Sequence, residues 1–532
     1  MAHSSAFKQF RRLLLNARNT HLAETGRTLL PPQNRRQFLK TSALGGAAVA
    51  SATSLSGCMG ASEKDIVIVG GGLAGLNAAY QLGKLGLKVD VYEASNRVGG
   101  RVRTVKNRLG PGLDTDLGGE LINTDHDDML ALVEDFGIGL TSRLEPNPDL
   151  DKVGYFYGGR KRSEAEMAQA LGPLAAQLMT DAELLDEDWE TYAPIFETQS
   201  LTEYLDQHAN LIPADPDIRD LIEGTVRVEY GVEPEESSAI QLLYLLPVVD
   251  GEHVEVLSTS DEAFVVNGGT ETLVSALKNL LHDQIHLGKA LTKLEAQEGN
   301  NGEGTSYTLT FNQHRRVKAK YVILALPFTA LRHVDIQVSL PESLQRFINE
   351  VDLGKNEKII AGVTQKVWRA ENGFEIEAWN DQTTSLLWDS SLRQPQLPVG
   401  SLTFFAGGNE VNITAQGNAQ QQGMRLVEEY EPLLPGLKAA SNQRFIRTAW
   451  HKKRYIGGGY TNFKPGQYTE LAEEWLYIEA DDPEEAQDFH VDNLVFAGEH
   501  TSDEYYGFMN GAAQTGRLAV QFILADIAAK MA

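Results

Sequence analysis

The segment from residue 65 to residue 93 constrains the fold more than any other part of this chain. It opens with a run of apolar, mostly β-branched residues at 65–69 (DIVIV), which predicts a strand buried inside a parallel sheet. A glycine-rich turn follows at 70–75, then a helical pattern at 76–85 and a second strand at 88–92. Strand, turn, helix and strand in this order predict a βαβ unit at the start of an α/β domain.

The spacing of the glycines in GGGLAG indicates what this unit binds. Gly70 permits the tight turn after the strand, Gly72 lets the backbone approach a pyrophosphate at the helix N-terminus, and Gly75 lets helix and strand pack closely. Glu93 ends the second strand, where a carboxylate accepts hydrogen bonds from a ribose hydroxyl. The glycines alone are weak evidence, but all these features in register predict a dinucleotide-binding domain.

The next motif, RVGGR at 97–101, favours FAD over NAD. It resembles the second fingerprint of two-dinucleotide-binding flavoproteins. Gly99 and Gly100 permit a close approach of the backbone, and Arg101 offers a guanidinium group to a diphosphate. A basic turn is the alternative interpretation of the same residues.

Later segments return to this domain, so the chain is predicted to alternate between two units. The later segments assigned to the dinucleotide-binding domain are a helix at 265–281, strands at 285–294, 307–311, 317–326 and 493–496, and a long helix within 507–525. The second unit takes the acidic, helix-prone residues 165–211 and the strand-rich residues 358–405. The predicted fold class is α/β, a Rossmann-type FAD-binding domain with a discontinuous α+β substrate domain. The predicted divisions are an export signal at 1–57, FAD-binding parts at 63–150, 263–335 and 485–532, and substrate-domain parts at 151–262 and 336–484.

The N-terminal region predicts export. Paired arginines at 35–36 precede an uncharged stretch at 41–57, a pattern typical of the twin-arginine route. Cys58 is the single cysteine among 532 residues, which excludes an internal disulfide and a multi-cysteine metal site. LSGC, ending at Cys58, resembles a lipobox whose cysteine is acylated, whereas cleavage after Ala52 is the alternative. We therefore expect a periplasmic or cell-envelope protein whose contact with the membrane, if any, is a lipid anchor at Cys58.

Composition narrows the partners to small molecules. The formal net charge of −26 argues against charge-driven binding of nucleic acid or anionic lipid. The chain shows no Ser-His-Asp arrangement, zinc-ligand spacing or Walker loop, so no metal is expected.

Seven separated motifs together resemble the flavin-containing amine oxidase family, the monoamine and polyamine oxidases. In the family's order they are DIVIVGGGLAGLNAAYQL, EASNRVGGRVRT, DTDLGGELI, GGTETLVSAL, YVILALP, IGGGYTNFKPG and LVFAGEHTSDEYYGFMNGAAQTGRLA. The resemblance covers most of residues 63–530. It implies two lobes with the flavin ring at their junction, a small-molecule amine as substrate, and oxygen or a respiratory carrier as electron acceptor. A homodimer stays open.

The resemblance also implies which residues contact FAD. The backbone of Leu291 would meet the adenine, Glu499 the ribityl region, and the Met509 amide the flavin pyrimidine at a helix start. Some family members attach FAD through a cysteine at the position of Gly459, so FAD is expected to be non-covalent here. The full set of expected FAD contacts is Gly70, Gly72, Ala74, Gly75, Glu93, Arg101, Gly118, Gly119, Leu291, Glu499 and Met509.

For the chemistry, the resemblance implies an aromatic cage in front of the flavin, formed by Tyr460 and Phe508. Their ring faces would attract a cationic amine and point its carbon at flavin N5. Hydride transfer to N5 would give an imine, then an aldehyde or ketone, with hydrogen peroxide formed from oxygen. Two aromatic residues in a core are the alternative interpretation. Phe508 replaces the commoner tyrosine, which keeps the ring face but loses a hydroxyl.

Three further residues complete the expected site. Lys358 falls where the family places a lysine bridged by water to flavin N5, with Lys355 as an alternative alignment. Glu120 could face the substrate cavity and bind a second positive charge, which would favour a polyamine, or it could belong to a salt bridge. His500 is expected to be a hydrogen-bonding neighbour of Glu499 rather than a base.

Two other functions stay open from the sequence. An L-amino acid oxidase on the same fold would need a buried arginine for the substrate carboxylate, and Arg227 is a candidate. A flavin-binding protein without turnover, serving in docking or assembly, is the second.

Overall fold

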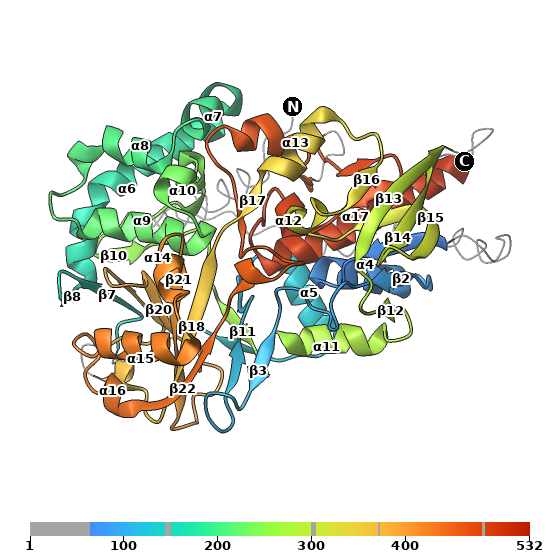
Figure 1. The fold of residues 1–532 in the computed structure, drawn as a ribbon. Helices are drawn as coiled ribbons and strands as arrows, with labels where there is room; N and C mark the ends of the chain where they lie inside the picture. The colour runs from blue at the N-terminus through green and yellow to red at the C-terminus, as the bar shows by residue number, and fades with distance from the viewer. Residues whose placement is uncertain (1–63, 144–149, 299–304, 371–372, 481–484, 532) are drawn as a thin grey trace, which may run out of the picture.

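The computed structural model describes residues 64–143, 150–298, 305–370, 373–480 and 485–531. The predicted export signal and Cys58 lie outside the described residues. Figure 1 shows two lobes side by side, one containing α4, α17 and β13–β16 and the other α6–α10 and β18–β22. Blue, yellow and red ribbon meet in the first lobe, so it is assembled from early, middle and late parts of the chain.

A nine-stranded sheet forms the first lobe, in the order β12-β2-β1-β15-β14-β13-β16, with β25 on β15 and β24 on β25. Strands β12, β2, β1, β15 and β25 pair in parallel, as predicted for the dinucleotide-binding unit. The strands are β1 (Lys64–Val69), β2 (Asp90–Tyr92), β12 (Ile285–His286), β13 (Leu291–Glu298), β14 (Thr305–Phe311), β15 (Arg315–Leu324), β16 (Asp335–Gln337), β24 (His490–Val491) and β25 (Leu494–Phe496).

Helix α4 (Leu73–Lys84) begins directly after the glycine-rich turn and packs on this sheet. Its buried face includes Leu76 and Leu82, which are fully buried, as are Val67 and Ile68 of β1. The C-terminal helix α17 (Met509–Met531) lies against α4, and Asn77 donates to the Ala513 carbonyl at 2.6 Å. Thus the last helix of the chain completes the domain that the first strand begins. The other helices of this lobe are α5 (Asp127–Asp135), α11 (Glu271–Leu280), α12 (Phe328–Leu331) and α13 (Glu342–Glu350).

The second lobe is a seven-stranded sheet in the order β22-β18-β21-β20-β19-β7-β8, with helices grouped along it. Helix α6 begins at a capping box in which Ser163 and Glu166 exchange side-chain and backbone hydrogen bonds. The strands are β7 (Val153–Tyr157), β8 (Arg160–Arg162), β18 (Asn356–Val363), β19 (Glu377–Asn380), β20 (Leu386–Asp389), β21 (Gly400–Gly407) and β22 (Ser441–Arg447). The helices are α6 (Glu164–Glu187), α7 (Trp189–Glu197), α8 (Leu201–Gln207), α9 (Asp217–Tyr230), α10 (Ala239–Leu245), α14 (Glu410–Thr414), α15 (Ala419–Glu429) and α16 (Leu437–Ala440).

Short strands join segments that are far apart in the sequence. β11 lies between β5 and β6, and β17 pairs with β23 next to the glycine run at 457–459. Such pairs fix the loops that carry the site. The short strands are β3 (Thr104–Lys106), β4 (Asp114–Asp116), β5 (Leu121–Ile122), β6 (Leu140–Ser142), β9 (Val248–Asp250), β10 (His253–Glu255), β11 (Phe264–Val266), β17 (Asp352–Leu353) and β23 (Thr461–Asn462).

Two predicted elements are wrong in extent. The helix predicted over 265–281 begins only at Glu271, because Val265 and Val266 pair with neighbouring strands and both Gly268 and Gly269 have positive φ angles. The strand predicted over 285–294 is two strands. Between them the Gly288 amide donates to the Ser95 carbonyl, which turns the chain around the end of β2.

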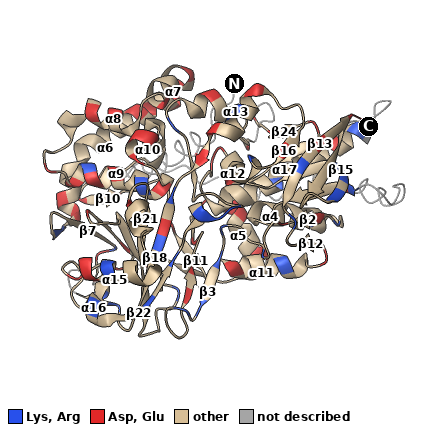
Figure 2. Ribbon diagram, in the orientation of Figure 1, with Lys and Arg blue, Asp and Glu red and all other residues tan. Residues whose placement is uncertain are grey.

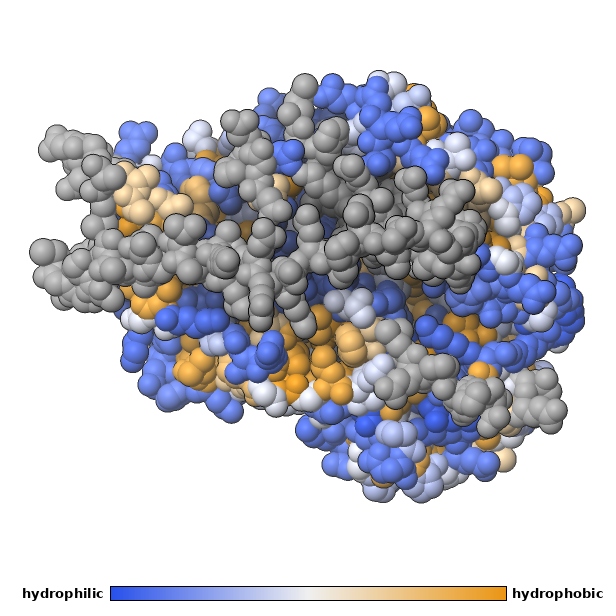
Figure 3. Space-filling model, turned by 180° about the vertical axis from the view of Figure 1, so that it is seen from behind, coloured by the Kyte–Doolittle hydropathy of each residue, from blue (hydrophilic) through white to orange (hydrophobic). Residues whose placement is uncertain are grey.

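The surface is mostly polar. Figure 2 shows acidic residues on several helices of the second lobe, in keeping with the acidic composition of residues 165–211. From behind, hydrophilic residues occupy most of the visible surface, with hydrophobic ones gathered towards its middle (Figure 3). In the described part of the chain, no helix has the length and hydropathy needed to span a membrane.

Candidate active site

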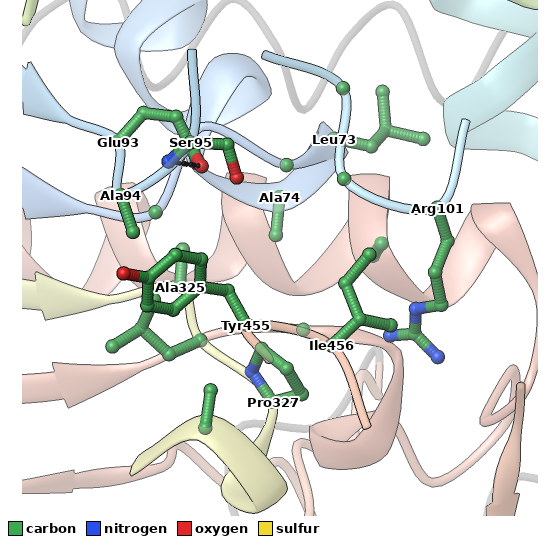
Figure 4. Close-up of a pocket in the computed structure, with 18 of the residues that line it drawn as sticks. Leu73, Ala74, Glu93, Ala94, Ser95, Arg101, Ala325, Pro327, Tyr455 and Ile456 are labelled. Carbon is green, nitrogen blue, oxygen red and sulfur yellow. Dashed lines mark hydrogen bonds between the residues drawn. The ribbon is translucent and has the colours of Figure 1, made fainter. Parts of the chain in front are cut away.

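A cavity lies at the glycine-rich turn between β1 and α4 (Figure 4), and the glycines of this turn differ in what they permit. Gly70 has φ +108°, and a Cβ there would lie 2.1 Å from the Ala325 carbonyl oxygen. A Cβ on Gly75 would lie 2.0 Å from the Gly70 carbonyl oxygen, so this glycine permits close packing of the turn and the helix. A Cβ on Gly72 would meet nothing within 4 Å. Gly72 therefore leaves the helix N-terminus open to the cavity, where an anionic diphosphate is favoured.

Glu93 is held at one side of this cavity by backbone amides. Its Oε2 accepts from the Gly71 amide at 2.8 Å and its Oε1 from the Ser95 amide at 2.7 Å. Each carboxylate oxygen keeps a second lone pair for another donor. The arrangement fits a ribose that donates its hydroxyls to Glu93, and Figure 4 shows Glu93 and Arg101 on opposite sides of the cavity.

Arg101 links the cavity to the late part of the chain. Its Nη1 donates to the Gly459 carbonyl at 2.6 Å and to Glu499 Oε1 at 2.8 Å. Glu499 also accepts from Thr461 Oγ1 and from the Gly507 amide. Burial alone would raise the pKa of Glu499, but the charge of Arg101 and the hydrogen bonds from Arg101 and the Gly507 amide lower it, so the carboxylate is ionised.

The imidazole ring of His500 lies beside the cavity with its two nitrogens free of hydrogen bonds to the described residues. Burial lowers its pKa to about 4, so the ring is neutral, and it packs edge-on against Phe328 with ring centroids 4.4 Å apart. Neither ring nitrogen has a hydrogen-bond partner among the described residues, so the expected hydrogen bond between His500 and Glu499 is wrong. A buried polar atom without a partner is costly, so a bound group that reaches His500 would be favoured. The open face at Gly72, the fixed Glu93 carboxylate and this unmatched imidazole together fit FAD.

Nine of the eleven expected FAD contacts line this cavity: Gly70, Gly72, Ala74, Glu93, Arg101, Gly119, Leu291, Glu499 and Met509. Gly75 and Gly118 do not. A Cβ on Gly118 would lie 1.6 Å from the Arg101 carbonyl oxygen, so Gly118 permits two backbones to touch.

A second cavity lies beside the first and shares part of its lining. Gly119, Tyr460, Gly507, Phe508 and Met509 line both. The predicted aromatic pair therefore stands where the two cavities meet, rather than in a closed core. Tyr460 precedes β23 and accepts from the Gly354 amide at 2.7 Å through its carbonyl, while the Phe508 ring packs on His126 at a centroid distance of 5.1 Å. Burial raises the pKa of Tyr460, and the charges of Glu229 and Glu262 raise it further, so its phenol is neutral.

Lys358 belongs to a buried network of ion pairs that also includes Glu120, Arg393 and Asp116. Its Nζ donates to Glu120 Oε2 and to the Gly118 carbonyl, both at 2.9 Å, and lies 4.9 Å from the centre of the Trp388 ring. Arg393 donates to Glu120 Oε1 at 3.2 Å and pairs with Asp116 at 2.6 Å. Lys355, the alternative alignment, is exposed and lines neither cavity.

Glu120 lines the second cavity, but both of its oxygens already have cationic partners. This placement agrees with the interpretation of Glu120 as part of a salt bridge. A substrate cation there would compete with Lys358 and Arg393.

Sequence reasoning missed most of the charged lining of the second cavity. Besides Glu120 and Lys358, the cavity is lined by Asp125, Arg143, Glu229, Glu262, Glu377 and Glu504. Arg143 is buried and pairs with Glu262 at 2.7 Å and Glu377 at 3.2 Å. Glu504 lies in the last of the seven motifs, but nothing there marked it as a cavity residue. The other five sit in no motif and come from separate elements, so no local pattern could have found them. Six carboxylates and two cations make the lining strongly acidic.

Arg227, the sequence candidate for binding a substrate carboxylate, lines neither cavity. It pairs with Glu223 and Glu233, each at 3.0 Å. That prediction is wrong, because the side chain of Arg227 is committed to its own helix and the loop after it.

Comparison with known proteins places this arrangement in a family. The model of the family described as "Flavin containing amine oxidoreductase" matches residues 73–524. The twin-arginine translocation signal model matches residues 32–52, which indicates export by the twin-arginine route. Among curated relatives, the flavin-containing amine oxidase B of Homo sapiens is 25% identical over 482 residues, covering 86% of each chain. The L-amino-acid oxidase of Bothrops pauloensis is 24% identical over 481 residues, covering 86% of this chain and 88% of the relative.

Solved structures share the fold at lower identity. Putrescine oxidase bound to putrescine superimposes with a TM-score of 0.70 at 20% identity, covering 87% of this chain and 99% of that one. Cyclohexylamine oxidase from Brevibacterium oxydans gives 0.69 at 20% identity, with the same coverage. The predicted fold class, two-domain and flavin-binding, is confirmed. With a family match over most of its length, this chain belongs to the flavin containing amine oxidoreductase family and is an FAD-dependent oxidoreductase that acts on amines.

Proposed function

We propose that this enzyme oxidises a primary or secondary amine in the acidic cavity, with the reacting carbon held between Tyr460 and Phe508. The observation that carries the proposal is that this aromatic pair lines both the cofactor cavity and the acidic cavity. Bound FAD supplies the two-electron chemistry, a hydride taken from the carbon next to nitrogen at flavin N5. The imine then hydrolyses to an aldehyde or ketone, and oxygen yields hydrogen peroxide.

The chain's own residues bind and orient the amine. The faces of the two rings attract the cationic amine and keep water away from it. This desolvation lowers the pKa of the ammonium, so its proton leaves to solvent and the neutral amine is the form that loses the hydride. The carboxylates of the lining outnumber its two cations, so a positively charged ligand is favoured over a negatively charged one. Lys358 keeps a buried positive charge beside the backbone of Gly118, and we propose that this charge assists the reaction with oxygen.

The charges favour an amine over an amino acid. An amino acid substrate needs a cation free to pair with its carboxylate, yet Arg143 is already held by Glu262 and Glu377. Lys358 is likewise held by Glu120. A carboxylate entering this cavity would meet repulsion from the acidic lining and would have to displace a buried partner.

Anaerobic mixing of the holoenzyme with amines and amino acids tests the proposal. Amines should bleach the flavin absorbance, amino acids should not, and admission of air should restore the colour with one peroxide per turnover. Tyr460→Ala should slow bleaching at least ~100-fold with FAD still bound, whereas Tyr460→Phe keeps the ring face and most of the rate. Bleaching by amino acids alone would reverse the assignment, and no bleaching by either class would remove it.

The cofactor attachment and the location are further proposals. Gly459 lies where a cysteine would be needed, so we propose that FAD is non-covalent and released by denaturation without proteolysis. Following twin-arginine export, we propose that the mature protein is periplasmic or in the cell envelope, with a lipid at Cys58 as its anchor. The mass of the mature N-terminal peptide distinguishes an acylated Cys58 from cleavage after Ala52.

A further inference from the structure

Glu229 stands out among the carboxylates of the acidic cavity because it has no partner. It lies in the last turn of α9 and lines the cavity. Among the residues that the structure describes, nothing donates a hydrogen bond to its side chain and no cation pairs with it. Three neighbours have cationic partners: Glu262 and Glu377 share Arg143, and Glu120 is held by Lys358 and Arg393. Burial raises the pKa of Glu504 to about 8 as well, but there the Tyr505 side chain partly offsets the rise.

An unpaired carboxylate in such a place is unfavourable for the folded protein. Burial raises the pKa of Glu229 to about 8, and the negative charges of Glu262 and Glu377 contribute to the rise. Arg143 does not relieve Glu229, since both of its ion pairs go to those two glutamates. A cation bound next to Glu229 would offset both the desolvation and the repulsion, so the structure favours a ligand with positive charge at this point.

Glu229 also lies close to the aromatic pair at which we propose that the amine reacts. Glu229 and Glu262 are near enough to Tyr460 for their charges to raise its pKa. Glu229 and the aromatic pair line one continuous cavity, so a single molecule can meet both. His126, which packs on Phe508, adds no competing cation, because burial lowers its pKa to about 3.

We propose that Glu229 binds the second ammonium group of a diamine or polyamine whose reacting end lies between Tyr460 and Phe508. This specificity rests on the amine oxidation proposed above. Glu229 would then have the role that the sequence suggested for Glu120, whose charge is already neutralised by Lys358 and Arg393. The preferred substrate is then a linear dication, and a monoamine lacks the second contact.

Glu229→Gln tests the assignment, since it removes the charge and keeps the shape. Glu235→Gln is the matched control, because Glu235 is exposed, lies outside both cavities and carries the same charge. The probes are α,ω-diaminoalkanes of increasing length and the corresponding n-alkylamines, with kcat and KM measured from peroxide production by the holoenzyme. FAD content and thermal melting show that each variant is folded.

We expect the wild-type enzyme to prefer the diamines. In Glu229→Gln, kcat/KM for diamines should fall at least ~10-fold, mainly through KM, while the values for n-alkylamines stay within about twofold or rise. Glu229→Asp keeps the charge but withdraws it by one methylene, so the preferred diamine should become longer.

Two results would overturn this role. One is a wild-type enzyme that turns over alkylamines as well as diamines, and the other is an equal loss for both series in Glu229→Gln. If no amine of either series is oxidised by the wild-type enzyme, it is the amine oxidation itself that fails.

Discussion

The two cavities that meet at Tyr460 and Phe508 are built in opposite ways. The cofactor cavity is formed largely by main chain and small residues, with Glu93 fixed by two backbone amides. The acidic cavity, where we propose that the amine binds, is formed by large and charged side chains, six of them carboxylates. A backbone cradle recognises the shape and phosphates that every FAD shares, whereas side chains select a particular amine.

The difference also decides what each cavity tolerates. In the cofactor cavity the limiting quantity is space, because a Cβ on Gly70 or Gly75 would overlap backbone atoms. In the acidic cavity it is the balance of buried charge, because three of its six carboxylates are paired with a buried cation. Three variants test this contrast.

The largest effect is expected from Gly72→Val, which fills space in the cofactor cavity. Gly72 has φ −73° and ψ −177°, which valine adopts readily, and its Cβ would meet no protein atom within 4 Å. The apoprotein should therefore fold, while flavin content after purification should fall more than ~10-fold. Absorbance at the flavin band per protein, together with circular dichroism, measures both. Gly83→Val on the exposed side of α4, where a Cβ also meets nothing within 4 Å, should retain FAD. Normal flavin content in Gly72→Val would show that this face does not receive the cofactor.

An intermediate effect is expected from Lys358→Met, which disturbs charge without closing space. Removing the ammonium leaves Glu120 with Arg393 alone, and breaking a buried ion pair costs about 3–5 kcal/mol of unfolding free energy. Adding Glu120→Gln should recover part of this loss, because the uncompensated charge is then gone. Chemical denaturation of the holoenzymes gives the three values. A double variant less stable than Lys358→Met would contradict the coupling.

The smallest effect is expected from Glu229→Gln, measured without substrate as the change of melting temperature with pH. The folded-state pKa of Glu229, about 8, exceeds its ordinary value of 4.5, so the folded protein holds this proton more tightly than the unfolded chain. The Glu229 carboxyl group therefore does not change the free energy of unfolding below about pH 4, and it progressively lowers that free energy as the pH rises towards 8. The variant should melt at the wild-type temperature at pH 4 and roughly 2 °C higher at pH 8.5. Glu235→Gln should show no such trend, and a Glu229→Gln gain that is equal at both pH values would rule out this titration.

The sequence was informative where function depends on consecutive residues. The strand at 65–69, the glycines that follow it and Glu93 lie close together in the chain, and the structure places them as the pattern predicted. Prediction was less accurate where pairing between distant segments decides, as at Val265 and Val266, which form a strand because β5 and β6 flank them. Gly118 is another such case, since its close contact is with Arg101, in an earlier segment of the chain.

What the sequence determined by itself is the cofactor domain and the family, because their motifs are short runs of residues with a fixed local geometry. What only the tertiary structure decided is which charges remain free. Glu120 is paired with Lys358 and Arg393, whereas Glu229 has no cationic partner among the described residues because Arg143 pairs with Glu262 and Glu377. Ion pairing depends on distances of a few ångströms between elements far apart in the chain, and no spacing along the sequence carries that information.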